Sequence, residues 1–182
     1  MNLRFTLLAI LSASLISVYS LSFGNDTPLP LKLTYEDLGK HSRSEIDCLA
    51  QNMYFESASE PKEGQIAVAL VTFNRMNNGN YPDTVCGVVN QKINGICQFS
   101  WRCDSKAIEK QKRLTRQSNS LYNEIHELAT RVYINQDSIE DVTRGALFYH
   151  ADYVKPTWNN MKTTQKIGRH IFYVKISRTK HG

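Results

Sequence analysis

The chain has 182 residues, of which 41% are hydrophobic, 21% are charged and only 5 are prolines. This length fits one domain that can bury a core of its own, and the composition excludes an intrinsically disordered protein. The formal net charge of +5 favours anionic partners in general. By itself it does not distinguish an acidic envelope polymer from nucleic acid.

The first twenty residues have the pattern of an export signal. Arg4 precedes an apolar run that ends at Val18 and whose only polar residues are Thr and Ser. The small side chains of Val18 and Ser20 fit the positions before a cleavage site, although a cut after Ser22 fits as well. We therefore expect residues 1–20 to be a signal peptide. The protein would be exported to the periplasm, the cell envelope or the exterior, with no stable membrane span afterwards. The alternative is an uncleaved anchor, which normally needs about 20 apolar residues.

Export would carry all four cysteines into an oxidising compartment, where an even number favours disulfides over free thiols. We favour a bond between Cys97 and Cys103, because the short loop between them closes easily, and this leaves Cys48 with Cys86. The two other pairings stay open from these spacings alone. No two cysteines have the C-x2-C spacing of zinc sites, so we expect neither a metal nor another cofactor.

The first half of the chain predicts a linker and then a helix. Residues 21–41 contain two prolines and are expected to be linker-like, with the domain proper over residues 42–177. Ser42 and Glu45 form a possible capping box at the start of a helix with a regular apolar face. That helix should end close to Glu56.

A second helix is predicted to begin with Pro61 at its first helical position and to stop at the polar residues 77–80. Residues 82–84 then predict the start of a short helical turn. Residues 95–103 are expected to form a loop or a short strand.

The second half changes from helix to strand. The polar and basic stretch over residues 105–120 is more often a solvated helix face than a binding patch, and it leads into an amphipathic helix over residues 121–133. Three strands are then predicted, over residues 145–150, 164–167 and 170–176. Gly168 would turn the last two into a hairpin, and residues 178–182 are expected to be a tail. Helices followed by strands predict an α+β fold.

Three clusters of side chains are candidates for chemistry. Glu56 follows two aromatic residues, and a carboxyl group beside aromatic surface is costly to ionise, so its pKa should rise and it could act as an acid. The alternative is a glutamate without a catalytic role that only faces water at a helix end. Two later clusters combine aromatic with polar groups and suit sugar binding. Their members are Gln98, Phe99, Ser100 and Trp101, and then Tyr149, His150, Trp158, Gly168, His170, Phe172 and Tyr173. The candidates for substrate contacts among them are Gln98, Phe99, Ser100, Tyr149, His150, Trp158 and His170. Either cluster can equally be structural. The first can be a buried strand next to a disulfide, and a lone histidine such as those of the second is more often structural than catalytic.

Several segments resemble, in order, the motifs of the SleB-like cell-wall hydrolases. Cys48–Arg75 reads CLAQNMYFESASEPKEGQIAVALVTFNR and resembles the opening motif of that family. The later matches are residues 81–89 (YPDTVCGVV), 97–101 (CQFSW), 145–150 (GALFYH), 156–158 (PTW) and 167–173 (IGRHIFY). Together they cover most of the chain after the predicted signal, and several motifs in one order are far more specific than any one of them.

The resemblance implies a lysozyme-like or lytic-transglycosylase-like domain, mainly helical with a small antiparallel β-sheet. Such a domain cuts peptidoglycan glycan strands between N-acetylmuramic acid and N-acetylglucosamine. The resemblance assigns the acid to Glu56, which would protonate the bridging oxygen and then, as a carboxylate, take the proton of the muramic acid 6-hydroxyl. The product would be a 1,6-anhydro sugar. The residues after the acid, Ser57, Ala58 and Ser59, depart from the Ala, Arg or Gly that relatives often have there.

Other functions stay open. Hydrolysis by water, as in a muramidase, would need a second carboxylate, for which Asp104 and Asp152 are candidates. A non-catalytic envelope protein would bind glycan through the aromatic clusters and leave cutting to others. A nucleic-acid binder is a remote alternative that rests only on basic charge, so we expect no nucleic-acid partner. A monomer is expected by default.

Overall fold

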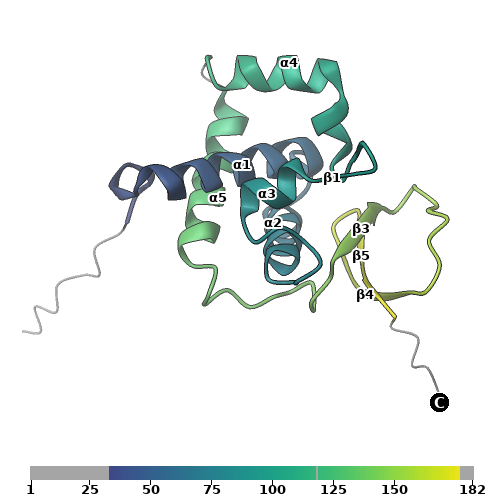
Figure 1. Cartoon of the computed structure of the whole chain (residues 1–182). Helices are drawn as coiled ribbons and strands as arrows, with labels where there is room; N and C mark the ends of the chain where they lie inside the picture. Colours follow the sequence, from purple (N-terminus) through teal and green to yellow (C-terminus); the bar gives the residue numbers. More distant parts are fainter. Residues whose placement is uncertain (1–32, 118, 177–182) are drawn as a thin grey trace, which may run out of the picture. The chain divides into compact units, whose positions relative to one another are not determined.

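Helix α1 (Lys40–Ser57) is the element around which the other helices pack (Figure 1). It contacts α2 (Lys62–Met76), α3 (Val85–Asn90) and α5 (Ser120–Ile134). The apolar faces predicted for these helices meet along α1, so the main hydrophobic core surrounds it.

The computed structural model describes residues 33–117 and 119–176 of the chain. The predicted signal peptide (1–20) and tail (178–182) lie outside these residues, so both stay predictions. Within the described ranges, no helix is both long enough and apolar enough to cross a membrane.

Short elements and a fourth long helix complete the helical part. They are η1 (Tyr35–Asp37), β1 (Lys92–Ile93), β2 (Ile96–Cys97), η2 (Ser100–Cys103) and α4 (Ser105–Leu114). The strands β1 and β2 form an antiparallel hairpin. Most of the basic stretch is therefore helical, and α4 packs chiefly on η2, above α1 in Figure 1.

A three-stranded antiparallel sheet follows α5. It consists of β3 (Phe148–Ala151), β4 (Met161–Ile167) and β5 (His170–Lys175), with β5 in the middle. Gly168 turns the chain between β4 and β5 with a φ of 56°, as predicted for a hairpin. Helices come first and the sheet last, which confirms the α+β prediction.

The β4–β5 turn is fixed to the junction between α1 and α2. The Glu60 carboxylate accepts a 2.8 Å hydrogen bond from the backbone N–H of Arg169. A Cβ atom at Gly168 would collide with that carboxylate, so the position requires glycine for space as well as for its φ. Two motifs more than a hundred residues apart are thereby brought into contact.

A buried polar network crosses the core between α1, α2 and η2. The amide of Asn52, which is fully buried, accepts a 3.1 Å hydrogen bond from Trp101 Nε1 and donates one of 3.3 Å to Thr72 Oγ1. Thr72 in turn donates to the Val68 carbonyl, and the ring of Trp101 stacks on Phe55 with centres 4.5 Å apart. Since each of these buried side chains has a hydrogen-bond partner, the network fixes η2 against both helices without leaving one of them unpaired.

The start of α1 differs from the prediction. Gly39 immediately precedes the first helical residue, whereas Ser42 and Glu45 lie inside the helix. The buried Glu45 carboxylate accepts a 2.6 Å hydrogen bond from the Val85 N–H, at the first turn of α3. The predicted capping box is therefore wrong, because Glu45 stabilises the start of a different helix. The linker predicted over residues 21–41 is also too long, since η1 and the first residues of α1 fall within it.

Both predicted disulfides are present. The bond between Cys97 and Cys103 encloses a short loop with a sequence separation of 6. The bond between Cys48 and Cys86 joins α1 to α3 across a separation of 38. The second bond therefore links two core helices, whereas the first stabilises only the segment that precedes α4.

Removing the two disulfides should have unequal effects. Replacing Cys48 and Cys86 by Ser should lower the free energy of unfolding by about 4 kcal/mol, against about 2 kcal/mol for Cys97 and Cys103, because the longer loop gains more entropy in the unfolded chain. Denaturant unfolding of the two double variants measures both values. Equal losses would contradict the larger role of the α1–α3 bond.

Candidate functional site

Glu56 lies in the last turn of α1, where its partly buried carboxylate contacts the small sheet. Its Oε2 accepts a 3.1 Å hydrogen bond from the hydroxyl of Tyr149 on β3. Tyr149 is paired with Phe172 of β5, and both side chains point toward α2, because paired residues of antiparallel strands share a face. The predicted end of the first helix is confirmed, and it places the carboxyl group at the edge of the core.

Opposing effects act on the protonation of Glu56. Burial raises its pKa above the ordinary value and outweighs the Tyr149 hydrogen bond and the positive charge of Arg75, which both lower it. Burial and the charge of Glu56 raise the pKa of Tyr149 well above its ordinary value, so this hydroxyl stays protonated and donates. A carboxyl group that keeps its proton to higher pH than usual is suited to general acid catalysis.

Arg75 supplies the positive charge beside this pair. The side chain is only 6% exposed, and its Nε donates a 2.8 Å hydrogen bond to the carbonyl of Leu147, just before β3. The guanidinium carbon lies 5.0 Å from the ring centre of Phe99 and 5.6 Å from that of Tyr81, so aromatic faces replace water around the charge. Its Nη1 has no hydrogen-bond partner among the described residues. Arg75 therefore fixes the start of β3 and acts electrostatically on Glu56.

The segment before β3 is fixed by a network that was not predicted from the sequence. Asn74 of α2 donates to the Asp141 carboxylate at 2.9 Å and to the Ala146 carbonyl at 3.1 Å. Asp141 also accepts from the N–H groups of Thr143 and Gly145, at 2.9 and 2.6 Å. Burial raises the pKa of Asp141, but a 2.6 Å hydrogen bond from the Thr143 hydroxyl and the bonds from Asn74 and the two N–H groups outweigh it, so the pKa lies below its ordinary value. An Asp followed by Thr and Gly is a turn signal that could have revealed this segment.

The predicted sugar-binding residues after β2 differ in their exposure. Ser100 is exposed and Gln98 is partly exposed, but Phe99 is only 3% exposed. Burial leaves no ring face of Phe99 for a sugar to stack on. The Phe99 ring instead packs against the guanidinium of Arg75.

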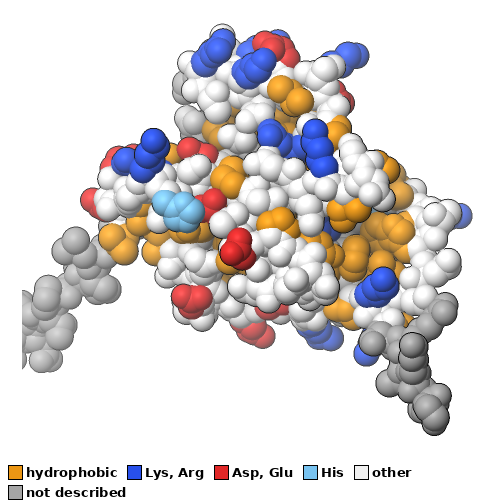
Figure 2. All heavy atoms as spheres, viewed as in Figure 1, with side chains coloured by type: hydrophobic (Ala, Val, Ile, Leu, Met, Phe, Trp, Pro, Cys, Tyr) orange, Lys and Arg blue, Asp and Glu red, His pale blue; other side chains and the backbone are white. Residues whose placement is uncertain are grey.

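The sheet divides the other predicted cluster into two groups. His170 lies with Tyr149 on the face toward α2, where burial lowers the His170 pKa and keeps the ring neutral near pH 7. On the opposite face, His150 stacks on Tyr173 at 5.2 Å with its Nε2 2.8 Å from the Tyr173 hydroxyl, and Trp158 packs against both rings. Trp158 is 41% exposed. Figure 2 shows hydrophobic side chains gathered on the surface over β3 and β5.

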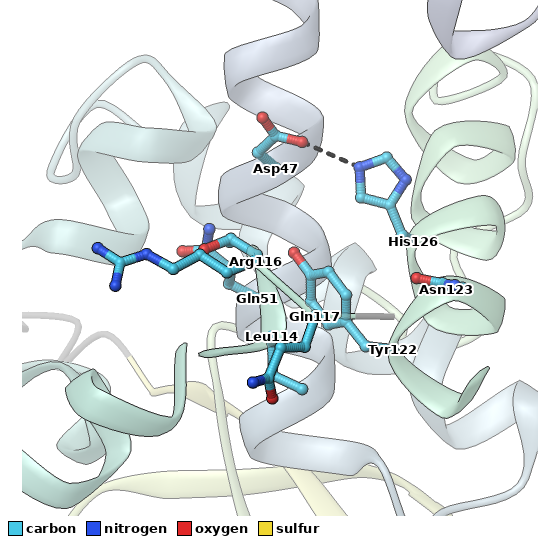
Figure 3. Close-up of a pocket in the computed structure, with 9 residues that line it drawn as sticks. Asp47, Gln51, Leu114, Arg116, Gln117, Tyr122, Asn123 and His126 are labelled. Carbon is cyan, nitrogen blue, oxygen red and sulfur yellow. Dashed lines mark hydrogen bonds and ion pairs between the residues drawn. The ribbon is translucent and has the colours of Figure 1, made fainter. Parts of the chain in front are cut away.

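A second polar group lies on the other side of α1. Asp47 precedes Glu56 by nine residues, or roughly two and a half helical turns, so the two carboxylates point in opposite directions. Asp47 accepts a 3.0 Å hydrogen bond from the Tyr35 hydroxyl and lies 2.9 Å from Nε2 of His126 on α5. Figure 3 shows this pair beside a hollow of about 470 Å³ between α1, α5 and the residues after α4. No sequence motif predicted this group.

The two alternative second carboxylates have other partners. Asp104 caps α4 and accepts a 2.7 Å hydrogen bond from the Lys106 N–H, and Asp152 lies 3.2 Å from Lys166 Nζ. Glu56, by contrast, has Tyr149 as its hydrogen-bond partner. In the part of the chain that the structure describes, no three His, Cys, Asp or Glu residues are grouped so that they could bind a metal ion.

Comparison with known proteins assigns the chain to a family. The family model described as Cell Wall Hydrolase matches residues 59–173, more than half of the chain. This chain belongs to the Cell Wall Hydrolase family. The match begins three residues after Glu56 and includes Arg75, the network around Asp141, and Tyr149.

Relatives of this chain include spore cortex-lytic enzymes. The one from Bacillus subtilis strain 168 is 29% identical over 136 residues, which are 74% of this chain and 39% of that protein. The one from Bacillus cereus is 31% identical over 134 residues, 72% of this chain and 45% of that protein. The chain thus spans less than half the length of these relatives.

Two solved structures are similar to the described domain. The catalytic domain of the Bacillus cereus SleB protein has a TM-score of 0.53 and 29% identity, and covers 75% of this chain and 94% of that one. The catalytic domain of the germination-specific lytic transglycosylase SleB from Bacillus anthracis has a TM-score of 0.54 and 30% identity, with 75% and 99% covered. The predicted resemblance to SleB-like hydrolases is confirmed.

Replacing Tyr149 by Phe tests how the carboxyl group is tuned. The variant keeps the ring but loses the hydroxyl that stabilises the ionised form, so the pKa of Glu56 should rise further. An enzyme that needs protonated Glu56 loses activity as the pH rises through this pKa. The descending limb of the pH–activity profile on peptidoglycan should therefore move to higher pH. Tyr173→Phe, on the other face of the sheet, is the control and should leave the limb in place, whereas an unmoved limb in Tyr149→Phe would contradict the assignment.

Proposed function

We propose that this chain cleaves the glycan strands of peptidoglycan between N-acetylmuramic acid and N-acetylglucosamine, with Glu56 as the catalytic acid. The observation that carries the proposal is a carboxyl group with a raised pKa at the edge of the core, hydrogen-bonded by Tyr149. Membership of the Cell Wall Hydrolase family and similarity to SleB catalytic domains support the same substrate.

The proposed reaction uses one carboxyl group twice. Glu56 gives its proton to the bridging oxygen, which leaves with N-acetylglucosamine as the bond to C1 of N-acetylmuramic acid breaks. The Glu56 carboxylate then takes the proton of the muramic acid 6-hydroxyl while that oxygen bonds to C1, which gives a 1,6-anhydro product without consuming water. Tyr149 and Arg75 stabilise the carboxylate that exists between the two steps. Similarity to a protein described as a lytic transglycosylase supports this route.

Sugar contacts are proposed for those polar and aromatic candidate side chains that are exposed or partly exposed. Gln98 and Ser100 offer an amide and a hydroxyl to sugar hydroxyls. Trp158, supported by His150, offers an exposed ring on which a sugar face can stack.

The two buried candidates are proposed to act through packing. Phe99 lies against the guanidinium of Arg75, and His170 packs edge-on against Tyr149 with ring centres 5.2 Å apart. Both would therefore position charged or hydrogen-bonding groups without touching the substrate.

The location and assembly of the protein form part of the same proposal. Peptidoglycan lies outside the cytoplasmic membrane, so the proposed function requires export, for which residues 1–20 are the proposed signal. Two disulfides among the described residues support an oxidising compartment. We propose a monomer whose acid–base steps need no metal or cofactor and whose partner is peptidoglycan, not nucleic acid.

Replacing Glu56 by Gln should slow the release of soluble fragments from peptidoglycan by about 100- to 10,000-fold, the range typical of losing a general acid. The parent should release 1,6-anhydro muropeptides, which mass spectrometry separates from reducing products. Because Gln carries no charge to desolvate, the variant should unfold at a temperature no lower than that of the parent.

Asp47→Asn is the matched control, since it removes a carboxylate from the opposite side of the same helix and should leave the release rate nearly unchanged. Fast release by Glu56→Gln would show that Glu56 is not the acid. Reducing products would instead indicate hydrolysis by water with a second carboxylate. A parent that binds the wall but releases nothing would favour a non-catalytic glycan-binding protein.

A further inference from the structure

Positive charge is concentrated in one short segment of the chain. Residues 102–116, here named the basic arm, contain six of the 22 Lys and Arg residues but only two of the 17 Asp and Glu residues. The basic arm, which includes α4, therefore has a net charge of +4, whereas the rest of the chain together has +1.

Five of the six cationic side chains of the basic arm are exposed to solvent, and only Arg102, which donates to Gln111, is partly buried. Those of Lys106, Lys110, Lys112 and Arg113 are all exposed. The ion pair between Lys112 and Glu109, at 3.7 Å, joins two side chains that are each more than half exposed, so it neutralises little of the charge. Figure 2 shows Lys and Arg side chains over the upper part of the view, where α4 lies in Figure 1.

A hollow near the end of α4 has no carboxylate in its lining. Its volume is about 200 Å³. The lining residues are Lys110, Arg113, Leu114, Gln117 and Asn119. Two cationic groups and two side-chain amides supply N–H donors, and no acidic side chain competes with a ligand, so the hollow suits a carboxylate or another small anionic group.

The basic arm is unsuited to insertion into a lipid surface. Helices that lie in a membrane surface present large apolar side chains such as Trp, Phe or Leu on one face. The apolar residues of α4 are Ala107, Ile108 and Leu114, and all three are partly or fully buried. A hydrophilic polyanion therefore matches this surface better than a bilayer does.

The basic arm begins beside the end of α1 that carries Glu56 and contacts that helix again farther along. Trp101, next to its start, stacks on Phe55, the neighbour of Glu56. Farther along, Gln111 donates a 2.7 Å hydrogen bond to Gln51. A helix of ten residues is about 15 Å long, a distance that an extended peptide of about four or five residues can span.

We propose that the basic arm binds the carboxylate groups of the peptides attached to the glycan strand, with the hollow at Lys110 and Arg113 as the main contact. This inference rests on the proposed function, because it names a further part of the same substrate. A strand lying at Glu56 would direct its peptides along α4, and the opposite charges attract. The chain then binds peptide-bearing strands more tightly than bare glycan, and the preference weakens as salt screens the charges.

Binding is measured with the full chain carrying Glu56→Gln, so that the substrate stays intact. In that background, four arm substitutions to Gln should weaken binding to peptidoglycan sacculi by about tenfold at low salt, and by less at high salt. These positions are Lys106, Lys110, Lys112 and Arg113. Gln is a good helix former, so α4 should persist. A control variant removes the same charge from other exposed positions and should change binding by less than about twofold. Its positions are Lys40, Lys62, Lys162 and Lys175.

Glycan strands stripped of their peptides by an amidase provide the second arm of the experiment. The Glu56→Gln chain with its basic arm unchanged should bind these stripped strands no more tightly than the arm variant binds them. If the arm variant and the Glu56→Gln chain bind intact sacculi equally, the inference is overturned. It is also overturned if the Glu56→Gln chain binds stripped and intact strands equally. The proposed function fails separately, when the chain with Glu56 in place releases no fragments from sacculi.

Discussion

The hydrogen bond from Tyr149 to Glu56 joins the helical core to the sheet, and most of the described structure fixes its two ends. On the helical side, the buried amide of Asn52 ties α1 to α2 and η2 a single turn before the carboxylate. On the sheet side, Asn74 and Arg75 at the end of α2 bind the segment that leads into β3. Because neither end can move far, the carboxyl group keeps a polar partner although it is partly buried.

The balance at Glu56 suits a group that must act as an acid and then as a base. Burial favours the protonated form, because an ionised carboxyl group loses hydration when it is withdrawn from water. The Tyr149 hydroxyl and the Arg75 charge favour the ionised form, and they only partly offset the burial. The surroundings of Glu56 therefore favour the protonated form through burial and the ionised form through Tyr149 and Arg75, which suits the single carboxyl group of the proposed reaction.

Local patterns predicted much of this structure, and long-range pairing explains what they missed. The helices, the turn at Gly168 and both disulfides follow from spacing and residue type. The capping role given to Glu45 was wrong because its partner, Val85, lies 40 residues away. Tyr149 and His150 are neighbours in sequence, and only the strand register shows that they lie on opposite faces. The pairing of Asp47 with α5 likewise depends on how two helices pack, which no local pattern encodes.

The proposed reaction requires Glu56 to keep its proton to higher pH than an ordinary glutamate. Its titration can be observed directly as the carboxyl band in the infrared difference between the parent and Glu56→Gln, recorded across a pH series. We expect a pKa above the ordinary value of 4.5. A pKa at or below that value would rule out the proposed role of Glu56, because the carboxyl group would then be ionised before it could donate a proton.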